Sequence, residues 1–239
     1  MLDVLPRWEL LRRAGIDFTT VDYFLVNSDR RFQRETLAQL GIPLEKTLSP
    51  ADYPHLEARS LLLPSFPASI SWMPKWSLDF LRDTFLSLRS PDRPAHRRLY
   101  ITRAGASARR LVNEPQLLDA LKPWNFEVVD LESFTVSEQA TLFAEAEVVL
   151  AVHGSGLTNL VFCQPGTAIV EIFSPYYVYP CYWLVANWQQ LRYSYLLGRA
   201  PTGEFLHQFL YPDSREEEVW IEPDTVVRHL VFAGISPIG

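Results

Sequence analysis

The segment from Glu147 to Phe162, EVVLAVHGSGLTNLVF, constrains the fold more than any other part of the sequence. Its apolar run from Val148 to Val152 is typical of a strand buried on both faces, and it ends at a turn that contains Gly154 and Gly156. Apolar residues at helical spacing follow this turn. A strand, a glycine turn and a helix in this order place free backbone amides at a helix start, which favours an anion such as phosphate. The alternative is a tight turn that needs glycine only for its backbone angles.

The pattern around this segment predicts an α/β fold with parallel sheets. Strands are expected at 99–101, 126–131, 148–152, 167–173 and 191–196, and helices at 113–121, 137–146, from 156, at 179–188 and at 223–233. Repeated strand–helix–strand units of this kind give a parallel sheet covered by helices, with ligands at the carboxyl ends of the strands. Before residue 90 the pattern is less regular, and the expected elements are a helix at 2–11, a strand at 21–26, a helix at 31–40 closed by Gly41, a buried strand at 61–63 and a helix through Leu88 capped by Ser77.

The segment Ser90 to Ala95, SPDRPA, is the predicted boundary between two lobes, because it contains two prolines and no apolar run. The domains are therefore expected at 1–90 and 91–239. The acidic run Glu216 to Glu218 is interpreted as a solvated surface.

Charge and cysteine usage narrow the function. The net charge of −6 argues against a nucleic-acid binder or an anionic-membrane binder. Residues 82–110 hold eight Arg and two acidic residues, a local balance of +6, which favours one discrete anionic ligand. The two cysteines, Cys163 and Cys181, are expected to be reduced and buried. No apolar run is long enough for a transmembrane helix, and a cytoplasmic location is inferred by elimination.

Polar residues mark three of the expected strand ends. Arg103 follows the strand at 99–101, and Arg109 and Arg110 come after a loop of small residues, so an arginine pair can clamp a diphosphate. The alternative is a solvated loop whose arginines pair with acids. His153 is a candidate base or hydrogen-bond donor, or else a histidine that fixes the turn. Glu171 can accept hydrogen bonds from a ribose diol, or form an internal ion pair with an arginine.

Several other chemistries lack their motifs. The positions two before and two after Ser155 are not glycine, which excludes a nucleophile elbow, and no P-loop is present. The sequence has no Asp-x-Asp pair, no zinc-spaced histidines and no G-x-G-x-x-G fingerprint in a first strand–helix turn. A metal-dependent reaction and a dinucleotide cofactor are therefore disfavoured.

Taken together, these motifs resemble the glycosyltransferase 61 family. The resemblance is carried by Ile101-Thr102-Arg103, by Arg110 to Glu114, by Gln139 and Ala146, by the block His153-Gly154-Ser155-Gly156-Leu157-Thr158-Asn159, and by Val170-Glu171-Ile172. It covers most of the chain, with a weaker pattern at Leu2 to Arg7 and Leu40 to Ile42.

The resemblance implies a GT-B arrangement of two Rossmann-type lobes and an inverting, metal-independent transfer from a nucleotide-sugar donor, expected to be a UDP-sugar, to a glycan or other hydroxyl acceptor. It places the donor in the C-terminal lobe, with the diphosphate at the arginines and the nucleoside at Glu171. The implied donor-binding residues are Arg103, Arg110, Asn113, His153, Gly154, Ser155, Gly156, Leu157, Thr158, Asn159 and Glu171.

The general base that inversion needs is expected from the N-terminal lobe, where Asp3 and Asp22 are candidates, with His153 as a third. Family members usually carry more chain before the equivalent of Leu2, so the acceptor lobe is expected to be incomplete. Two interpretations remain open: a sugar transferase, or a truncated module that keeps the donor fold without catalysis.

Overall fold

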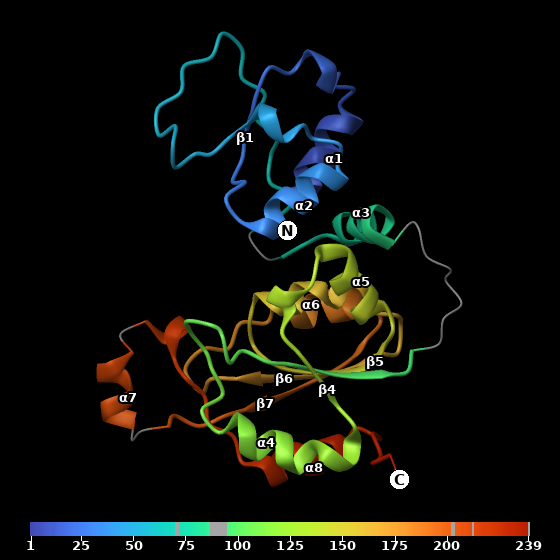
Figure 1. Cartoon of the computed structure of the whole chain (residues 1–239), viewed down its shortest axis with the longest axis vertical. Coiled ribbons are helices and arrows are strands. Elements are labelled where there is room, and N and C mark those ends of the chain that lie inside the picture. Colours follow the sequence, from blue (N-terminus) through green and yellow to red (C-terminus); the bar gives the residue numbers. More distant parts are fainter. Residues whose placement is uncertain (70–71, 87–94, 202–203, 212, 239) are drawn as a thin grey trace. The chain divides into compact units, whose positions relative to one another are not determined.

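The computed structural model describes residues 1–69, 72–86, 95–201, 204–211 and 213–238, and the chain forms two compact units (Figure 1). Unit 1 comprises Met1–Ser90 together with Thr135–Ala140, and unit 2 comprises Pro91–Phe134 together with Thr141–Gly239. Of the segment that the sequence marks as the boundary, 90–95, all but Ala95 lies outside the described residues.

Unit 2 is built on a five-stranded parallel sheet with the strand order β4-β3-β5-β6-β7. This confirms the predicted α/β class. The strands are β3 Arg97–Ile101, β4 Glu127–Val129, β5 Ala146–Val152, β6 Ala168–Phe173 and β7 Arg192–Leu197. The helices are α4 Glu114–Leu121, α5 Val136–Ala144 (which begins in unit 1), α6 Cys181–Trp188, α7 Glu204–Leu210 and α8 Pro223–Phe232.

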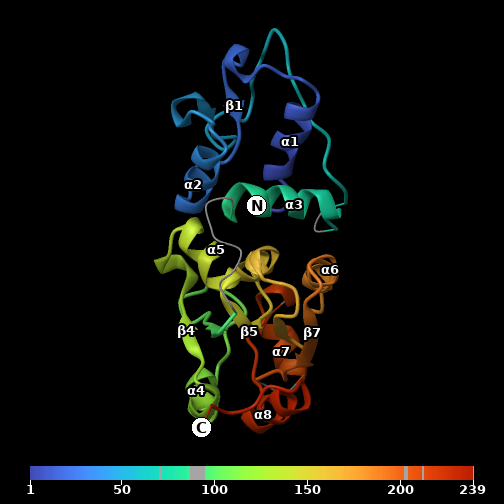
Figure 2. The same cartoon turned by 90° about the vertical axis from the view of Figure 1, so that its right-hand side faces the viewer.

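Strand β5 lies in the middle of this sheet because both of its faces are apolar. Leu150 is fully buried and pairs with Tyr100 of β3 on one side and with Val170 of β6 on the other. These three side chains point into a core closed by α4 and α8, which lie on one side of the sheet in Figures 1 and 2. The opposite face is covered by α6 and by the segment after β5. The carboxyl end of β5 therefore opens between the ends of β3 and β6.

The helix predicted from Gly156 is present as a 3₁₀ helix, Ser155–Phe162. One prediction for unit 2 was wrong. The acidic run is not a solvated surface: Glu217 is buried and binds the hydroxyl of Ser174, and Glu218 forms an ion pair with Arg110. A run of like charges in the sequence does not indicate which of its residues will bind a polar or charged group from another part of the chain.

The described residues before 87 in unit 1 form a small parallel sheet and the helices α1, α2 and α3. These elements are α1 Leu5–Arg13, β1 Phe24–Leu25, α2 Arg31–Gln39, β2 Thr47–Leu48 and α3 Lys75–Leu86. The expected strand at 21–26 is limited to two residues, because its partner β2 is equally short. The end of α2 is as predicted, since Gly41 adopts the left-handed backbone angle of φ 75°.

The predicted strand at Leu61 to Leu63 is absent. These residues belong to no strand, and the three leucines are 71%, 50% and 78% exposed. A three-residue apolar run followed by Pro64 cannot be distinguished from a loop by its pattern alone. Ser77 is not a cap either: it lies inside the first turn of α3, where its hydroxyl donates to the carbonyl of Pro74 at 2.7 Å. Leu88, the predicted end of this helix, lies outside the described residues.

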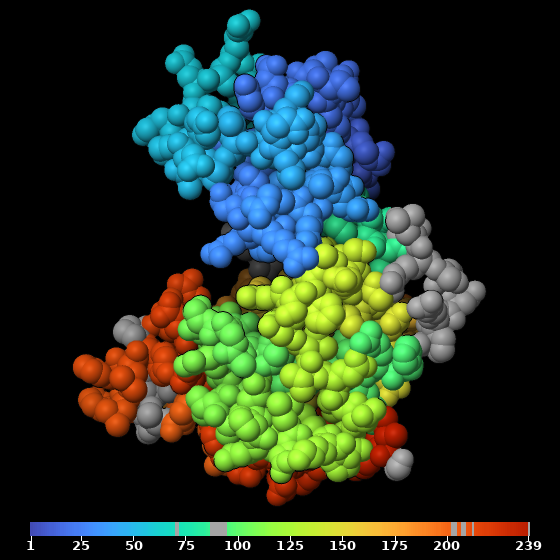
Figure 3. Space-filling view, in the orientation of Figure 1, coloured from blue at the N-terminus to red at the C-terminus, as the bar shows by residue number. Residues whose placement is uncertain are grey.

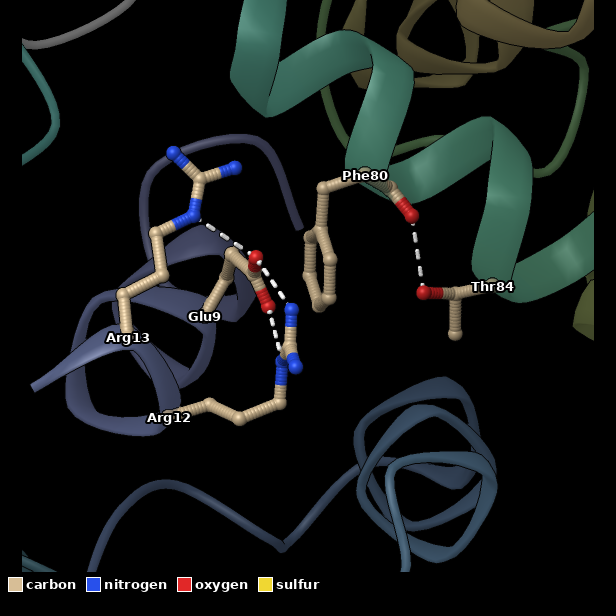
Figure 4. A network of polar contacts seen from close by, with 5 residues as sticks. All are labelled: Glu9, Arg12, Arg13, Phe80 and Thr84. Atoms are coloured by element: carbon tan, nitrogen blue, oxygen red, sulfur yellow. Dashed lines mark hydrogen bonds and ion pairs between the residues drawn. The ribbon is translucent and has the colours of Figure 1, made fainter. Parts of the chain in front are cut away.

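A buried carboxylate, Glu9, lies where the end of α1 packs against α3. Glu9 is 4% exposed and accepts hydrogen bonds from Arg12 and Arg13, while the ring of Phe80 on α3 points toward this network (Figure 4). The bonds from Arg12 are the main reason why the pKa of Glu9 lies below its usual value. The arginines thus allow an ionised side chain to remain in the interface between two helices of unit 1.

The start of α5 belongs to unit 1 because its amides are capped there. The amide of Val136 donates to the carboxylate of Glu35 on α2 at 2.8 Å. Thr135 and Glu138 form a reciprocal capping box, in which the amide of each residue donates to the side chain of the other. The sequence Thr-x-x-Glu signals this start at Val136, one residue before the predicted one.

The surface of unit 2 includes α7, which the sequence pattern did not predict. Phe205, Leu206, Phe209 and Leu210 of this short helix are all exposed, and the segment stands at the edge of unit 2 in Figure 3. Cys163 and Cys181 are free and buried, as predicted. None of the helices in the described part of the chain has both the length and the apolar character needed to cross a membrane.

We expect Leu150→Ala to lower the free energy of unfolding by about 2–5 kcal/mol, because it leaves a cavity in the central strand. Leu197→Ala on the edge strand β7 is the matched control, since Leu197 is 54% exposed and its truncation should cost less than about 0.5 kcal/mol. Denaturant unfolding measures both, and equal losses would contradict the assigned core.

Candidate functional site

The turn after β5 needs its glycines for space rather than for unusual backbone angles. Gly154 has φ 177°, an extended conformation open to any residue, and Gly156 is not left-handed either. A Cβ at position 154 would lie 2.1 Å from Nη1 of Arg103, and one at position 156 would lie 2.7 Å from Cδ1 of Leu131. The turn is therefore shaped by the close approach of two neighbouring side chains.

The backbone amides of this turn are available to a ligand. Those of Gly154, Ser155 and Gly156 make no hydrogen bond within the described residues, while the next amide, of Leu157, donates to the carbonyl of Gly154. Successive unpaired amides at the start of a helix form a concave site for an anion.

Arg103 brings a positive charge directly to these amides. Its Nε and Nη2 donate to the carbonyls of Arg109 and Ala108 at 3.1 and 2.7 Å, which fixes the guanidinium over Gly154. Its Nη1 has no partner within the described residues and is not among the fully buried atoms. Burial, followed by the charge of Arg109, lowers the pKa of Arg103. An anion at the turn would offset both effects.

Arg109 is the second cation at the turn. Its backbone is left-handed with φ 52°, and its Nε donates to the carbonyl of His153 at 3.0 Å. The guanidinium lies 5.7 Å from the centre of the Tyr177 ring and also donates to the carbonyl of Arg215. Neither Arg103 nor Arg109 forms an ion pair with a carboxylate anywhere in the described ranges, so the loop from 103 to 109 carries two arginines without a direct ion-pair partner.

The side chain of His153 belongs to a buried chain of three polar groups. Its Nδ1 lies 2.5 Å from Oε1 of Glu171, and the hydroxyl of Tyr193 donates to Oε2 of the same carboxylate at 2.5 Å. Glu171 is fully buried and His153 is 5% exposed. Burial and the charge of Glu171 raise the pKa of Tyr193, so this tyrosine keeps its proton and acts as the donor.

Aromatic rings enclose this chain. The His153 ring stacks on Phe173 at 4.9 Å and contacts Tyr177 and Tyr182 at 5.3 and 5.4 Å between centres. A pocket of about 510 Å³ lies next to them, lined by Phe173, Val178, Pro180, Trp183, Tyr193, Ser194 and Tyr195. The site thus pairs a cationic turn with an aromatic pocket.

Two of the predicted donor-binding residues lie elsewhere in unit 2. Arg110 is exposed and forms an ion pair with Glu218, so Arg109 takes the place at the turn that was predicted for Arg110. Asn113 is buried with its amide bonded to both backbone groups of Ile221, and this fixes the segment before α8. The positions of Arg110 and Asn113 in the sequence motif do not reveal whether each residue contacts a ligand or stabilises the fold.

The rest of the glycine block divides between the surface and the core. Ser155 is exposed at the mouth of the turn, and Thr158 is half-buried and hydrogen-bonded to Tyr182. Leu157 is buried, and Asn159 is buried with its amide donating to the carbonyl of Gly156 at 3.2 Å. Leu157 and Asn159 therefore stabilise the turn from the protein interior.

The sequence analysis gave no role to three tyrosines of the site. Tyr177, Tyr182 and Tyr193 come from the loop before α6, from α6 itself and from β7, and no motif joins them. Tyr193 comes two residues after Leu191 in the expected strand, where an aromatic ring is common and needs no functional explanation. Only the register of β7 against β6 shows that its hydroxyl reaches Glu171.

The candidate bases in unit 1 stay predictions. Asp3 is half-buried close to the amino terminus, and Asp22 is exposed. In the described ranges no three His, Cys, Asp or Glu side chains are grouped so that they could hold a metal ion.

The fold and the turn define an α/β protein with a cationic glycine turn at the carboxyl edge of its parallel sheet. The family described as Glycosyltransferase 61 matches residues 1–170, and the chain belongs to this family. This confirms the resemblance noted in the sequence.

Three curated plant proteins are similar to part of this chain. The chain is similar to β-1,2-xylosyltransferase RCN11 of Oryza sativa subsp. japonica, with 33% identity over 136 residues, which is 49% of this chain and 25% of the relative. A β-1,2-xylosyltransferase of Arabidopsis thaliana is 31% identical over 121 residues, or 45% of this chain and 22% of the relative. The β-1,2-xylosyltransferase XAX1 of Oryza sativa subsp. japonica is 35% identical over 162 residues, or 60% and 26%. The matches span about a quarter of the length of these relatives.

We expect Gly154→Ala to weaken the binding of inorganic pyrophosphate about tenfold or more, because the new methyl group displaces the guanidinium of Arg103. The flexible arginine can move, so the fold should persist. Gly105→Ala is the matched control, since nothing lies within 4 Å of its Cβ. Calorimetric titration measures both, and equal affinities for pyrophosphate in the two variants would remove Arg103 from the turn.

Proposed function

We propose that this chain carries the donor-binding part of a glycosyltransferase, and that the turn after β5 holds the diphosphate of a nucleotide sugar. The observation that carries the proposal is the meeting of three unpaired amides with two arginines that have no ion-pair partner within the described residues. A diphosphate supplies the acceptors and the negative charge that both sets of donors lack.

The same arrangement supports a transfer that needs no metal ion. When the glycosidic bond to the donor breaks, negative charge develops on the departing nucleoside diphosphate. Fixed amides and guanidinium groups stabilise that charge without reorganising at the moment of reaction. We propose that the reaction inverts the configuration of the sugar, as the membership of the glycosyltransferase 61 family suggests. The proposed acceptor is a hydroxyl group of a glycan.

The donor is proposed to be a UDP-sugar with a pentose, and UDP-xylose is the first probe because the three relatives are named xylosyltransferases. The aromatic pocket beside β7 is the place that we assign to the base, since bases stack on aromatic rings at about 1–3 kcal/mol each. Phe173 links the two parts, because its ring contacts His153 on one side and Tyr195 on the other.

We expect Arg103→Ala and Arg109→Ala each to weaken UDP binding by about 10- to 100-fold, because each removes a charged donor from the diphosphate. Arg110→Ala should change the affinity little, since its guanidinium is already paired with Glu218. Calorimetric titration of UDP into the three folded variants measures this.

Arg215→Ala is a further control, because the Arg215 side chain is exposed and paired with Asp213. Equal losses in Arg103→Ala and Arg215→Ala would contradict the proposed site, and a folded wild-type protein without affinity for UDP would reject the function. UDP binding without sugar transfer to any acceptor would instead favour the non-catalytic module.

A further inference from the structure

Glu171 cannot meet a ligand directly. Its carboxylate is fully buried, and each of its oxygens already accepts a hydrogen bond, one from His153 and one from Tyr193. A ribose diol could reach it only by displacing one of these partners. Any effect of Glu171 on a ligand is therefore indirect and passes through His153 or Tyr193.

The direction of the two hydrogen bonds follows from the chemistry of their members. Tyr193 keeps its hydrogen, because burial and the charge of Glu171 raise its pKa. Its hydroxyl therefore donates, and the carboxylate is the acceptor. The other oxygen, Oε1, lies 2.5 Å from Nδ1 of His153. Because an ionised carboxylate can only accept hydrogen bonds, the hydrogen of the imidazole must be on Nδ1.

This leaves Nε2 as the other polar atom of the ring. Nε2 has no hydrogen-bond partner within the described residues and is not among the fully buried unpaired atoms, although the residue as a whole is only 5% exposed. The rings of Phe173, Tyr177 and Tyr182 surround the imidazole, and Arg109 holds the backbone carbonyl of His153. The ring is held on several sides and offers one atom to a ligand.

We propose that Glu171 is a positioning residue that fixes the Nδ1–H tautomer of His153, while Tyr193 occupies its other oxygen, so that Nε2 accepts a hydrogen bond from a hydroxyl of the bound nucleotide sugar. This rests on the proposed function. Phosphate oxygens are acceptors and cannot pair with the lone pair of Nε2 in the neutral ring, whereas the hydroxyls of the ribose or of the sugar can. The arginines and amides hold the diphosphate, and His153 selects the hydroxyl beside it.

The tautomer is tested on the whole chain without ligand, by nitrogen–proton correlation spectra of its five histidines. Wild-type His153 is expected to carry its hydrogen on Nδ1. In Glu171→Gln the amide can donate or accept, so the Nε2–H form should appear. The signals of His229, which pairs with Ser194 on the other face of the sheet, should not change. An Nε2–H tautomer in the wild type, or an unchanged tautomer in Glu171→Gln, would overturn the proposal.

Two further variants guard against a misfolded Glu171→Gln. Tyr193→Phe leaves the Oε1 partner in place and is expected to keep the Nδ1–H form. Glu127→Gln changes an exposed carboxylate on β4 that binds Arg97 and should leave the His153 signals unaltered. Loss of the Nδ1–H form in Glu127→Gln would show that the change expected in Glu171→Gln is not specific to Glu171, and it would overturn the assignment.

Binding separates the role of the hydroxyl from that of the diphosphate. Glu171→Gln is expected to bind UDP or UDP-xylose about tenfold more weakly than the wild type, and to bind inorganic pyrophosphate equally well. Equal losses for UDP and UDP-xylose assign the ribose hydroxyl, and a loss for UDP-xylose alone assigns the sugar. A matching loss for pyrophosphate would mean that the site has collapsed and would overturn the proposal. Absence of UDP binding in the wild type would reject the proposed function, while the tautomer is decided by the ligand-free spectra.

Discussion

The position of strand β5 decides where the site can lie. Because β5 is apolar on both faces and paired along both edges, it can occupy only the interior of the sheet. Its carboxyl end then opens between the ends of β3 and β6, which is where ligands collect in parallel sheets. Residues distant in sequence, such as Arg103 and His153, meet there because the three strands run in the same direction.

The glycine turn at this point is a feature of packing. Gly154 leaves room for the guanidinium of Arg103, and Gly156 leaves room for the side chain of Leu131. Neither residue needs a left-handed backbone, so the simpler interpretation of the sequence, a tight turn that requires special angles, does not explain them. The turn and the arginine loop depend on each other, since the loop is fixed by bonds from Arg103 to its own carbonyls.

The sequence predicted unit 2 better than unit 1 for a physical reason. Unbroken apolar runs at 148–152 and 167–173 identify buried strands, and the rule of strand ends then selects Arg103, His153 and Gly154. In unit 1 the run Leu61 to Leu63 is as apolar, yet no strand of the described residues pairs with it. The choice between Arg109 and Arg110 depends on one left-handed backbone angle, and the role of Tyr193 depends on strand register. Neither is visible in composition or spacing.

The charges of the site are kept apart, and this separation is what gives the turn its capacity for an anion. If Glu171 formed an ion pair with an arginine, as one interpretation of the sequence suggested, that arginine would already be neutralised. Instead the carboxylate is satisfied by an imidazole and a phenol. The hydrogen bonds of the two arginines go to backbone carbonyls, which orient the guanidinium groups and leave them without an ion-pair partner in the described residues. Burial of Glu171 therefore serves the cationic turn in two ways, because it orders His153 and leaves Arg103 and Arg109 unpaired.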